Sequence, residues 1–390
     1  MAIKNVLDRV FTQAVEAGEV PGVAAFAADR NGMIYEGAFG VRDRAEGGAM
    51  TTDSVFWIAS MTKAITSVAA MQLVERGKLA LDAPIADVLP DLADRPVLEG
   101  FDAAGKPRLR PAKRPITLRH LLTHTAGFGY DIWNADLGRY MAQKEIPGII
   151  SCANAALTTP LTSDPGEKWQ YGINIDFVGK AVEKASGETL ETYFRNHIFS
   201  PLEMKTTGFI LDQTRRERLV RMHVRGADGS LTPIAFEIPQ TPEFFMGGGG
   251  LYGSGRDYLR FTRMLLNGGT LDGVQILKPE TVSTMAQNQI GGLEAGVMAT
   301  ALPDSSNDVN FFPGMSQKWG LGFLINTEDT VGGRKAGSLA WAGLGNTYFW
   351  IDRDAGLTGV ILSQILPFAD HKAVALYGAF ERALYQAYQE

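Results

Sequence analysis

A serine followed three residues later by a lysine, Ser60-Met61-Thr62-Lys63, is the strongest chemical signal in the chain. The apolar stretch Val55–Ala59 precedes it, and Ala64–Glu75 follows it with the nearly all-round apolar pattern of a buried helix. If Ser60 opens that helix, Lys63 lies on the same face, within reach of the serine hydroxyl. The hydroxyl becomes a nucleophile when a neighbouring base takes its proton, and desolvation can lower the pKa of a lysine enough for that role. The start of the helix would also offer backbone N–H groups to an oxyanion.

A second candidate for proton transfer is Tyr171, which lies just before a predicted helix. A tyrosine there can pass a proton between serine and leaving group if nearby lysine charge lowers its pKa. The alternatives are less specific. Ser60 could be a helix cap beside a surface lysine, and Tyr171 could be a core aromatic with its hydroxyl hydrogen-bonded elsewhere. The chain contains no other Ser-x-x-Lys and no Gly-x-Ser-x-Gly turn that would compete with Ser60.

Hydrophobic periodicity predicts the elements that must position these residues. An amphipathic helix is expected over Asn5–Ala17, ending at Gly18, and a hairpin follows it with Asn31-Gly32 as the turn. Together with the C-terminal segments, these elements predict one antiparallel sheet built from both termini and flanked by helices. The predicted strands are Val23–Ala28, Met33–Val41, Trp319–Asn326, Ser338–Trp341, Thr347–Asp352 and Gly356–Ser363, and the closing helix starts at Asp370.

The middle of the chain is richer in helix and loop. It contains the Leu118–Leu122 segment and a predicted helix over Asp176–Ala185, which is capped by Gly187. Asp94–Pro115 and Gly291–Pro313 are predicted to be long exposed loops that could wall a site.

Composition excludes several classes of protein. The 390 residues are 45% hydrophobic and 21% charged, with a net charge of −6 and no basic stripe, so a nucleic-acid partner is not expected. The single Cys152 forbids a disulfide within the chain, and the five histidines contain no His-Glu-x-x-His pair, so a metal site is not expected. The chemistry of Ser60, Lys63 and Tyr171 needs no metal and no organic cofactor. The N-terminal segment lacks the pattern of a secretory leader, and no apolar stretch is long enough to span a membrane. These features predict a soluble cytoplasmic protein with a small-molecule partner, and they leave the oligomeric state open.

Six ordered segments give the chain a resemblance to the class C β-lactamase and penicillin-recognising superfamily, and within it to the family VIII carboxylesterases. The segments are Phe56–Lys63, Val74–Pro90, Ile116–Gly127, Pro165–Gly187, Gly247–Phe261 and Trp341–Asp352. The resemblance implies a β-lactamase-like fold. The expected division is an α/β domain of residues 1–78 and 262–390 and a mainly helical domain of residues 79–261, with the site in the cleft between them.

Transferred residue by residue, the resemblance implies Ser60 as nucleophile, with Lys63 and Tyr171 as proton carriers. The oxyanion hole would be the backbone N–H groups of Ser60 and Leu344. The third family motif, usually Lys-Thr-Gly, falls on Trp341-Ala342-Gly343, and Lys335-Ala336-Gly337 is a rival match.

The chain departs from the lactam-processing pattern at two places. Ile173 stands where β-lactamases carry an asparagine, and Trp341 stands where they carry a lysine that helps to hold the substrate carboxylate. A neutral, apolar wall suits an uncharged ester better than an anionic lactam. The residues expected to contact substrate are Trp341, Gly343, Phe128, Tyr130 and Phe245, with Trp133 and Met246 as further wall candidates, although core packing is an alternative for each aromatic.

The predicted function is therefore a serine hydrolase that cleaves small carboxylic esters with short acyl groups through an acyl-enzyme. Three alternatives remain open at this point. They are a β-lactamase or D-alanyl peptide hydrolase, an acyltransferase that uses the same Ser-Lys-Tyr site, and a binding protein on an inactive enzyme fold.

Overall fold

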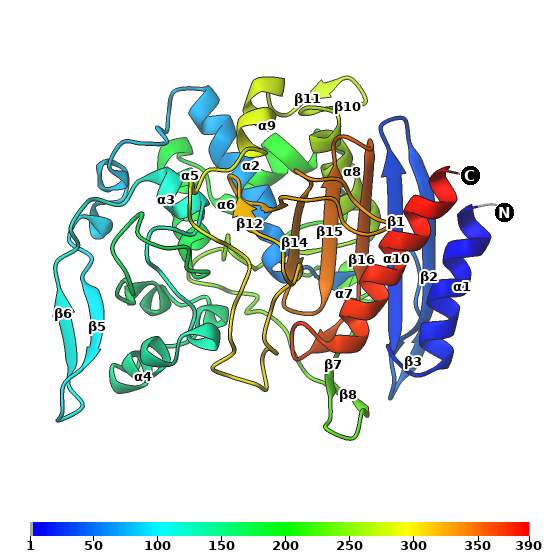
Figure 1. Ribbon diagram of the computed structural model, residues 1–390, viewed down its shortest axis with the longest axis horizontal. Coiled ribbons are helices and arrows are strands. Elements are labelled where there is room, and N and C mark those ends of the chain that lie inside the picture. Colours follow the sequence, from blue (N-terminus) through cyan, green and yellow to red (C-terminus); the bar gives the residue numbers. More distant parts are fainter. Residues whose placement is uncertain (1–2, 390) are drawn as a thin grey trace.

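The computed structural model describes residues 3–389, and its centre is an eight-stranded sheet (Figure 1). Neighbouring strands are antiparallel throughout, in the order β12-β13-β14-β15-β16-β1-β2-β3. The pairing of β1 with β16, in which Ala24 lies opposite Leu362, joins the two ends of the chain. The predicted sheet built from both termini is therefore confirmed. Its strands are β1 (Gly22–Asp29), β2 (Met33–Asp43), β3 (Gly47–Ala49), β12 (Gln317–Trp319), β13 (Leu324–Asn326), β14 (Leu339–Gly343), β15 (Thr347–Asp352) and β16 (Leu357–Leu362).

Helices cover both faces of the sheet. They are α1 (Ile3–Glu16), α2 (Thr62–Glu75), α3 (Leu118–Leu122), α4 (Ala135–Gln143), α5 (Asn174–Ser186), α6 (Leu190–Phe194), α7 (Gln213–Arg216), α8 (Gly255–Leu266), α9 (Pro279–Met285) and α10 (His371–Gln389).

Alternation along β15 shows which helix covers which face. Tyr348 and Trp350 contact Tyr377 of α10, whereas Phe349 between them contacts Tyr258 of α8. Because successive side chains of a strand point to opposite faces, α10 and α8 lie on opposite sides of the sheet. Helix α1 packs beside α10, so both termini lie at the same end of the molecule (Figure 1).

The remaining strands form small separate pairs and one three-stranded sheet. They are β4 (Phe56–Trp57) with β9 (Tyr252–Gly253), β5 (Val97–Phe101) with β6 (Pro107–Arg110), β10 (Thr270–Leu271) with β11 (Val274–Gln275), and β7 (Met222–Arg225) with β8 (Leu231–Ile234) and β17 (Ile365–Leu366). The β4–β9 pair matters for the site, because it holds the chain immediately before Ser60.

Helix α2 is buried almost all round, as its sequence predicts. It packs against α5, and α5 packs in turn against α3 and α6. The expected domain boundary between residues 261 and 262 falls inside α8. This helix packs on the central sheet, where it contacts β1, β15 and β16.

Two sequence predictions of local structure are wrong. Trp319–Asn326 is not one strand but the hairpin β12–β13, because the chain turns back where the Gly320 N–H donates to the Phe323 carbonyl. Asp94–Pro115 is not a plain loop, since β5 and β6 pair within it. Short polar hairpins of this kind carry little hydrophobic alternation, so the pattern on which the prediction depended is weak there.

Within residues 3–389, no helix combines the length and the apolar character that a membrane crossing requires. In the same residues, no three His, Cys, Asp or Glu side chains group as metal ligands.

Candidate active site

The chain turns sharply at the residue before the candidate nucleophile. Strand β4 leads into a short 3-10 helix, Ala59–Met61, which continues into α2. Ala59 takes the left-handed conformation with φ = 46°, which costs about 1–3 kcal/mol for a residue with a side chain. This turn brings Ser60 to the wall of a cavity of about 220 Å³, which we call the Ser60 cavity.

Lys63 is fully buried beside Ser60 in the first turn of α2. Its Nζ lies 3.0 Å from Ser60 Oγ, 3.0 Å from Tyr130 OH and 2.6 Å from the Gly248 carbonyl oxygen. Burial lowers the pKa of Lys63 to about 7, against an opposing effect of the Asp176 carboxylate. Three acceptors match the three N–H groups of an ammonium, so loss of one proton frees a lone pair for the Ser60 hydroxyl. The geometry expected from the Ser-x-x-Lys spacing is thus present.

Gly248 links Lys63 to a carboxylate that the sequence analysis did not single out. Its carbonyl accepts from Lys63, and its N–H donates to Asp176 Oδ1 at 2.8 Å. A Cβ at Gly248 would lie 2.5 Å from Asp176 Oδ2, so only glycine fits between the two charged groups. Burial raises the pKa of Asp176, and the neighbouring lysine opposes that rise. The signal available in the sequence was a carboxylate on the otherwise apolar face of α5.

Tyr171 also lies beside the nucleophile, with its ring centroid 4.8 Å from Lys63 Nζ. Burial raises the pKa of Tyr171, and hydrogen bonds with Ser60 and Trp341 offset only part of that rise. The expectation that lysine charge would lower the pKa of Tyr171 therefore does not hold. Tyr171 keeps its proton in this structure, and Lys63 is the group that can lose one near neutral pH.

The second tyrosine, Tyr130, was expected only as a wall residue. It does line the Ser60 cavity, and its hydroxyl also accepts a hydrogen bond from Lys63. Burial holds its pKa well above the usual value, so it too remains a phenol.

Trp341 lies behind Tyr171 rather than at the surface of the cavity. It is 3% exposed, and its Nε1 donates to Tyr171 OH at 3.0 Å. Among the residues described, the lining of the Ser60 cavity does not include Trp341. The indole therefore orients the tyrosine and is not placed to form a substrate wall.

This placement predicts the effect of Trp341→Phe. The substitution removes one donor to Tyr171 while an aromatic ring remains, so kcat should fall about tenfold and KM should change little. Steady-state kinetics on one ester checks the split between kcat and KM. The matched control is Trp319→Phe, which removes the neighbouring indole donor to the Leu122 carbonyl and should leave kcat near the wild-type value. A raised KM with unchanged kcat in Trp341→Phe would return Trp341 to the role of substrate wall.

Gly343 allows strand β14 to approach the nucleophile turn. A Cβ there would lie 2.4 Å from the Ile58 carbonyl oxygen and 2.3 Å from Thr347 Oγ1. The next residue, Leu344, lines the Ser60 cavity together with Ser60. The two residues whose backbone N–H groups are expected to form an oxyanion hole thus line the same cavity.

The structure separates the remaining predicted wall residues. Trp133 and Met246 line the Ser60 cavity, whereas Phe128 and Phe245 do not. Phe128 is fully buried and stacks on Phe177, and Phe245 packs on Phe209. For these two rings the core-packing alternative applies. The other lining residues are Trp57, Ala59, Asp131, Ile132, Gly148, Ile149, Ile150, Phe236, Gly248, Gly249, Leu302, Ser305 and Leu366.

The rival third motif lies elsewhere. Lys335 is about half exposed, and its Nζ pairs with Asp329 at 2.8 Å. It is not among the described residues that line the Ser60 cavity. Asn174, which directly follows Ile173 in the sequence, is buried. Its Nδ2 donates to the Phe128 carbonyl and contacts His124 Nδ1. Neither residue can supply the lactam contacts of the family pattern.

The two predicted loops differ in their relation to the cavity. Leu302 and Ser305 bring Gly291–Pro313 to the wall, whereas no described residue of Asp94–Pro115 lines it.

Comparisons with known proteins agree with this architecture. The beta-lactamase family profile matches residues 7–383. Monacolin J acid methylbutanoyltransferase of Aspergillus terreus is 35% identical, over 98% of this chain and 96% of that protein. Lovastatin esterase of Penicillium rubens is 33% identical, over 98% of each chain. The solved structure of unliganded simvastatin synthase (LovD) from Aspergillus terreus matches with a TM-score of 0.86 at 32% identity, covering 99% of this chain and 98% of that one.

Both the profile and the relatives cover nearly the whole chain, including the turn at Ser60, α5 and strand β14. The chain belongs to the beta-lactamase family.

Proposed function

We propose that this protein is a carboxylesterase that cleaves small, neutral esters through an acyl-enzyme on Ser60. Lys63, once deprotonated, takes the Ser60 proton as the hydroxyl attacks the ester carbonyl. The oxyanion that forms is stabilised by the N–H groups of Ser60 and Leu344. Tyr171, held by Trp341, donates its phenol proton to the departing alcohol and regains a proton from the Lys63 ammonium. Water then attacks the acyl-enzyme and releases the acid.

The main support for this proposal is the charge of the residues that line the Ser60 cavity. Among the residues described, no Lys, Arg or His lines the Ser60 cavity, and Asp131 is its acidic member. A substrate carboxylate would lie beside aromatic and aliphatic side chains without a cation, and burying an unpaired charge is costly. The small volume, about 220 Å³, suits a short acyl group.

The relatives support the same reading. A methylbutanoyltransferase and a lovastatin esterase, each at least 33% identical, act by their names on a short acyl group or on an ester. Neither name refers to a lactam.

The proposal predicts a large difference between two substrate classes. p-Nitrophenyl esters with acyl groups of two to five carbons should exceed nitrocefin in kcat/KM by at least about a thousandfold, the equivalent of about 4 kcal/mol for an unpaired carboxylate. Absorbance assays on one preparation measure both. The matched control is a cephalosporin with its carboxylate masked as an ester, which should recover part of the lost rate. Equal kcat/KM for p-nitrophenyl esters and nitrocefin would contradict the proposal.

Acyl transfer is the second candidate, and the transferase among the relatives at 35% identity favours it. The same assay separates the two, because p-nitrophenol release reports acylation of Ser60 and product analysis reports which nucleophile takes the acyl group. With p-nitrophenyl 2-methylbutanoate and an added apolar alcohol, a hydrolase gives mainly 2-methylbutanoic acid. A transferase gives mainly the new ester, and the alcohol accelerates turnover where deacylation is slow.

A further inference from the structure

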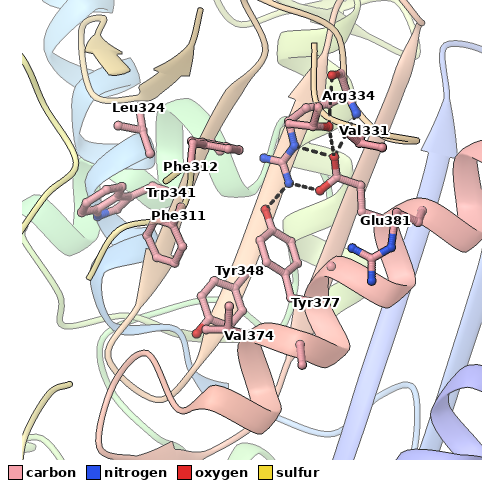
Figure 2. Close-up of a pocket in the computed structure, with 15 residues that line it drawn as sticks. Phe311, Phe312, Leu324, Val331, Arg334, Trp341, Tyr348, Val374, Tyr377 and Glu381 are labelled. Carbon is pink, nitrogen blue, oxygen red and sulfur yellow. Dashed lines mark hydrogen bonds and ion pairs between the residues drawn. The ribbon is translucent and has the colours of Figure 1, made fainter. Parts of the chain in front are cut away.

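A second cavity, about 410 Å³ in volume, lies against helix α10 and shares no lining residue with the Ser60 cavity (Figure 2). We call it the α10 cavity. Aromatic side chains form much of its wall: Phe311, Phe312, Trp341, Tyr348 and Tyr377. Its volume falls in the range of pockets that hold small organic ligands, about 300–1,000 Å³.

A buried arginine supplies the polar end of this cavity. Arg334 is 1% exposed, and its Nε and Nη2 donate to Glu381 and to Tyr377 OH. Its Nη1 has no hydrogen-bond partner among residues 3–389. In Figure 2 this nitrogen carries no dashed line and lies on the side of the Phe311 and Phe312 rings. Because a guanidinium has five N–H donors, two of them remain available to an occupant of the cavity.

The charges at the cavity favour an anion. Glu381 pairs with Arg334 and compensates its charge. Arg382, one residue further along α10, also lines the cavity, and its side chain lies against Gly332 and Gly378 at the surface. Two cations and one carboxylate leave one positive charge in excess, which matches a monoanion.

We propose that the α10 cavity binds a small aromatic monocarboxylate. The carboxylate accepts hydrogen bonds from Arg334 Nη1, and the ring packs among Phe311, Tyr348 and Trp341. Charge-assisted hydrogen bonds of a guanidinium to a carboxylate are stronger than neutral ones, and aromatic rings pack favourably edge to face. A dianion such as phosphate would need more donors than the single free edge of Arg334 offers.

Trp341 is common to this cavity and to the reacting groups. One side of the indole lines the α10 cavity, and its Nε1 donates to Tyr171 OH. An occupant that packs on Trp341 therefore contacts the residue that orients the proposed proton carrier.

Isothermal titration calorimetry with 2-naphthoate tests the proposal on the intact protein and does not require enzymatic activity. We expect a Kd of about 1 mM or tighter, and 2-naphthamide, which has the same shape without the charge, should bind at least about tenfold more weakly. Arg334 itself is a poor site for substitution, because its loss leaves Glu381 buried and unpaired. Two variants at the cavity avoid that problem.

Val374→Trp fills the cavity from α10 and should abolish binding of 2-naphthoate, while Arg382→Gln at the exposed mouth should weaken it about threefold at low salt. Thermal unfolding confirms that both variants are folded. No binding to the wild type, equal binding of 2-naphthamide, or full binding to folded Val374→Trp would each overturn the proposal. Because these are binding measurements, failure of the proposed esterase activity would leave them unaffected.

Discussion

Ser60→Ala should lower ester hydrolysis by at least about 10⁴-fold while leaving the fold intact. The oxyanion N–H groups and the cavity remain, but they cannot replace covalent chemistry, and residual rates in comparable enzymes come from binding and oxyanion stabilisation alone. The Ser60 side chain lies beside Lys63 and Tyr171 and forms no part of the core, so its removal leaves no large void. Initial rates with p-nitrophenyl butanoate and an unfolding curve measure the two effects.

The chain offers a matched control for this experiment. Ser305 lines the same cavity without a lysine partner among the residues described, so Ser305→Ala should keep most of the activity. Mass spectrometry after treatment with a fluorophosphonate should place the adduct on Ser60. An adduct on Ser254 or Ser338 instead would refute the assignment. Those two hydroxyls serve locally, one as the N-cap of α8 and the other as a donor to the Lys335 carbonyl.

Lys63→Met should lower kcat by about 10²–10⁴-fold, the usual contribution of acid–base catalysis. The pH profile of the wild type should show the cause. With the pKa of Lys63 lowered to about 7 by burial, the ammonium form dominates below that pH and cannot accept the Ser60 proton. We therefore expect kcat/KM to rise from about pH 6 to about pH 8 and then level off. The midpoint belongs to Lys63 and Asp176 together, because the two groups titrate as a pair.

Asp176→Asn separates the role of Lys63 from that of its surroundings. The asparagine can still accept from the Gly248 N–H, but the charge that favours the ammonium form of Lys63 is gone. The pKa of Lys63 should then fall further, and the rising limb of the profile should move to lower pH.

Tyr171→Phe should lower kcat at least about a hundredfold without moving the rising limb of the pH profile, since Tyr171 stays protonated. An activity that is flat from pH 5 to pH 9 in the wild type would show that Lys63 is not the base.

Local spacing explains why Ser60 and Lys63 could be predicted from the sequence. Two residues that stand three positions apart in a helical segment are close in space whatever the rest of the fold is. The apolar residues around the motif also predict that it is buried. The same holds for the amphipathic helix α1 and the hairpin β1–β2, whose boundaries the periodicity places within a few residues.

Tertiary contacts explain what the sequence could not predict. The Lys63–Gly248–Asp176 connection brings together three segments that are distant in the chain, and nothing local marks Gly248 as the residue between two charges. Phe128 and Tyr130 stand two residues apart in one segment, yet one packs in the core and the other lines the cavity. Outside a helix or strand, the direction in which an aromatic side chain points depends on its tertiary neighbours. The sequence therefore could not show that Phe128 packs in the core while Tyr130 lines the cavity.

Trp341 shows a different limit. The sequence predicted that Trp341 lies on a strand, and it showed a tryptophan at the position where lactam-processing relatives carry a lysine. Its indole faces Tyr171 because the rings of Trp319, Phe311 and Tyr171 surround it, which is a property of the assembled core.

The pairing of β1 with β16 has a consequence for synthesis of this protein on the ribosome. The β1–β2 hairpin is made early relative to β16, because the strand that completes the other edge of β1 follows only after the other strands of the central sheet. Throughout that interval β1 presents an apolar face and an edge of unpaired backbone groups, the kind of surface that associates with other nascent chains. The central sheet can therefore be completed only after β16 has been made, and until then β1 and β2 would need protection by chaperones.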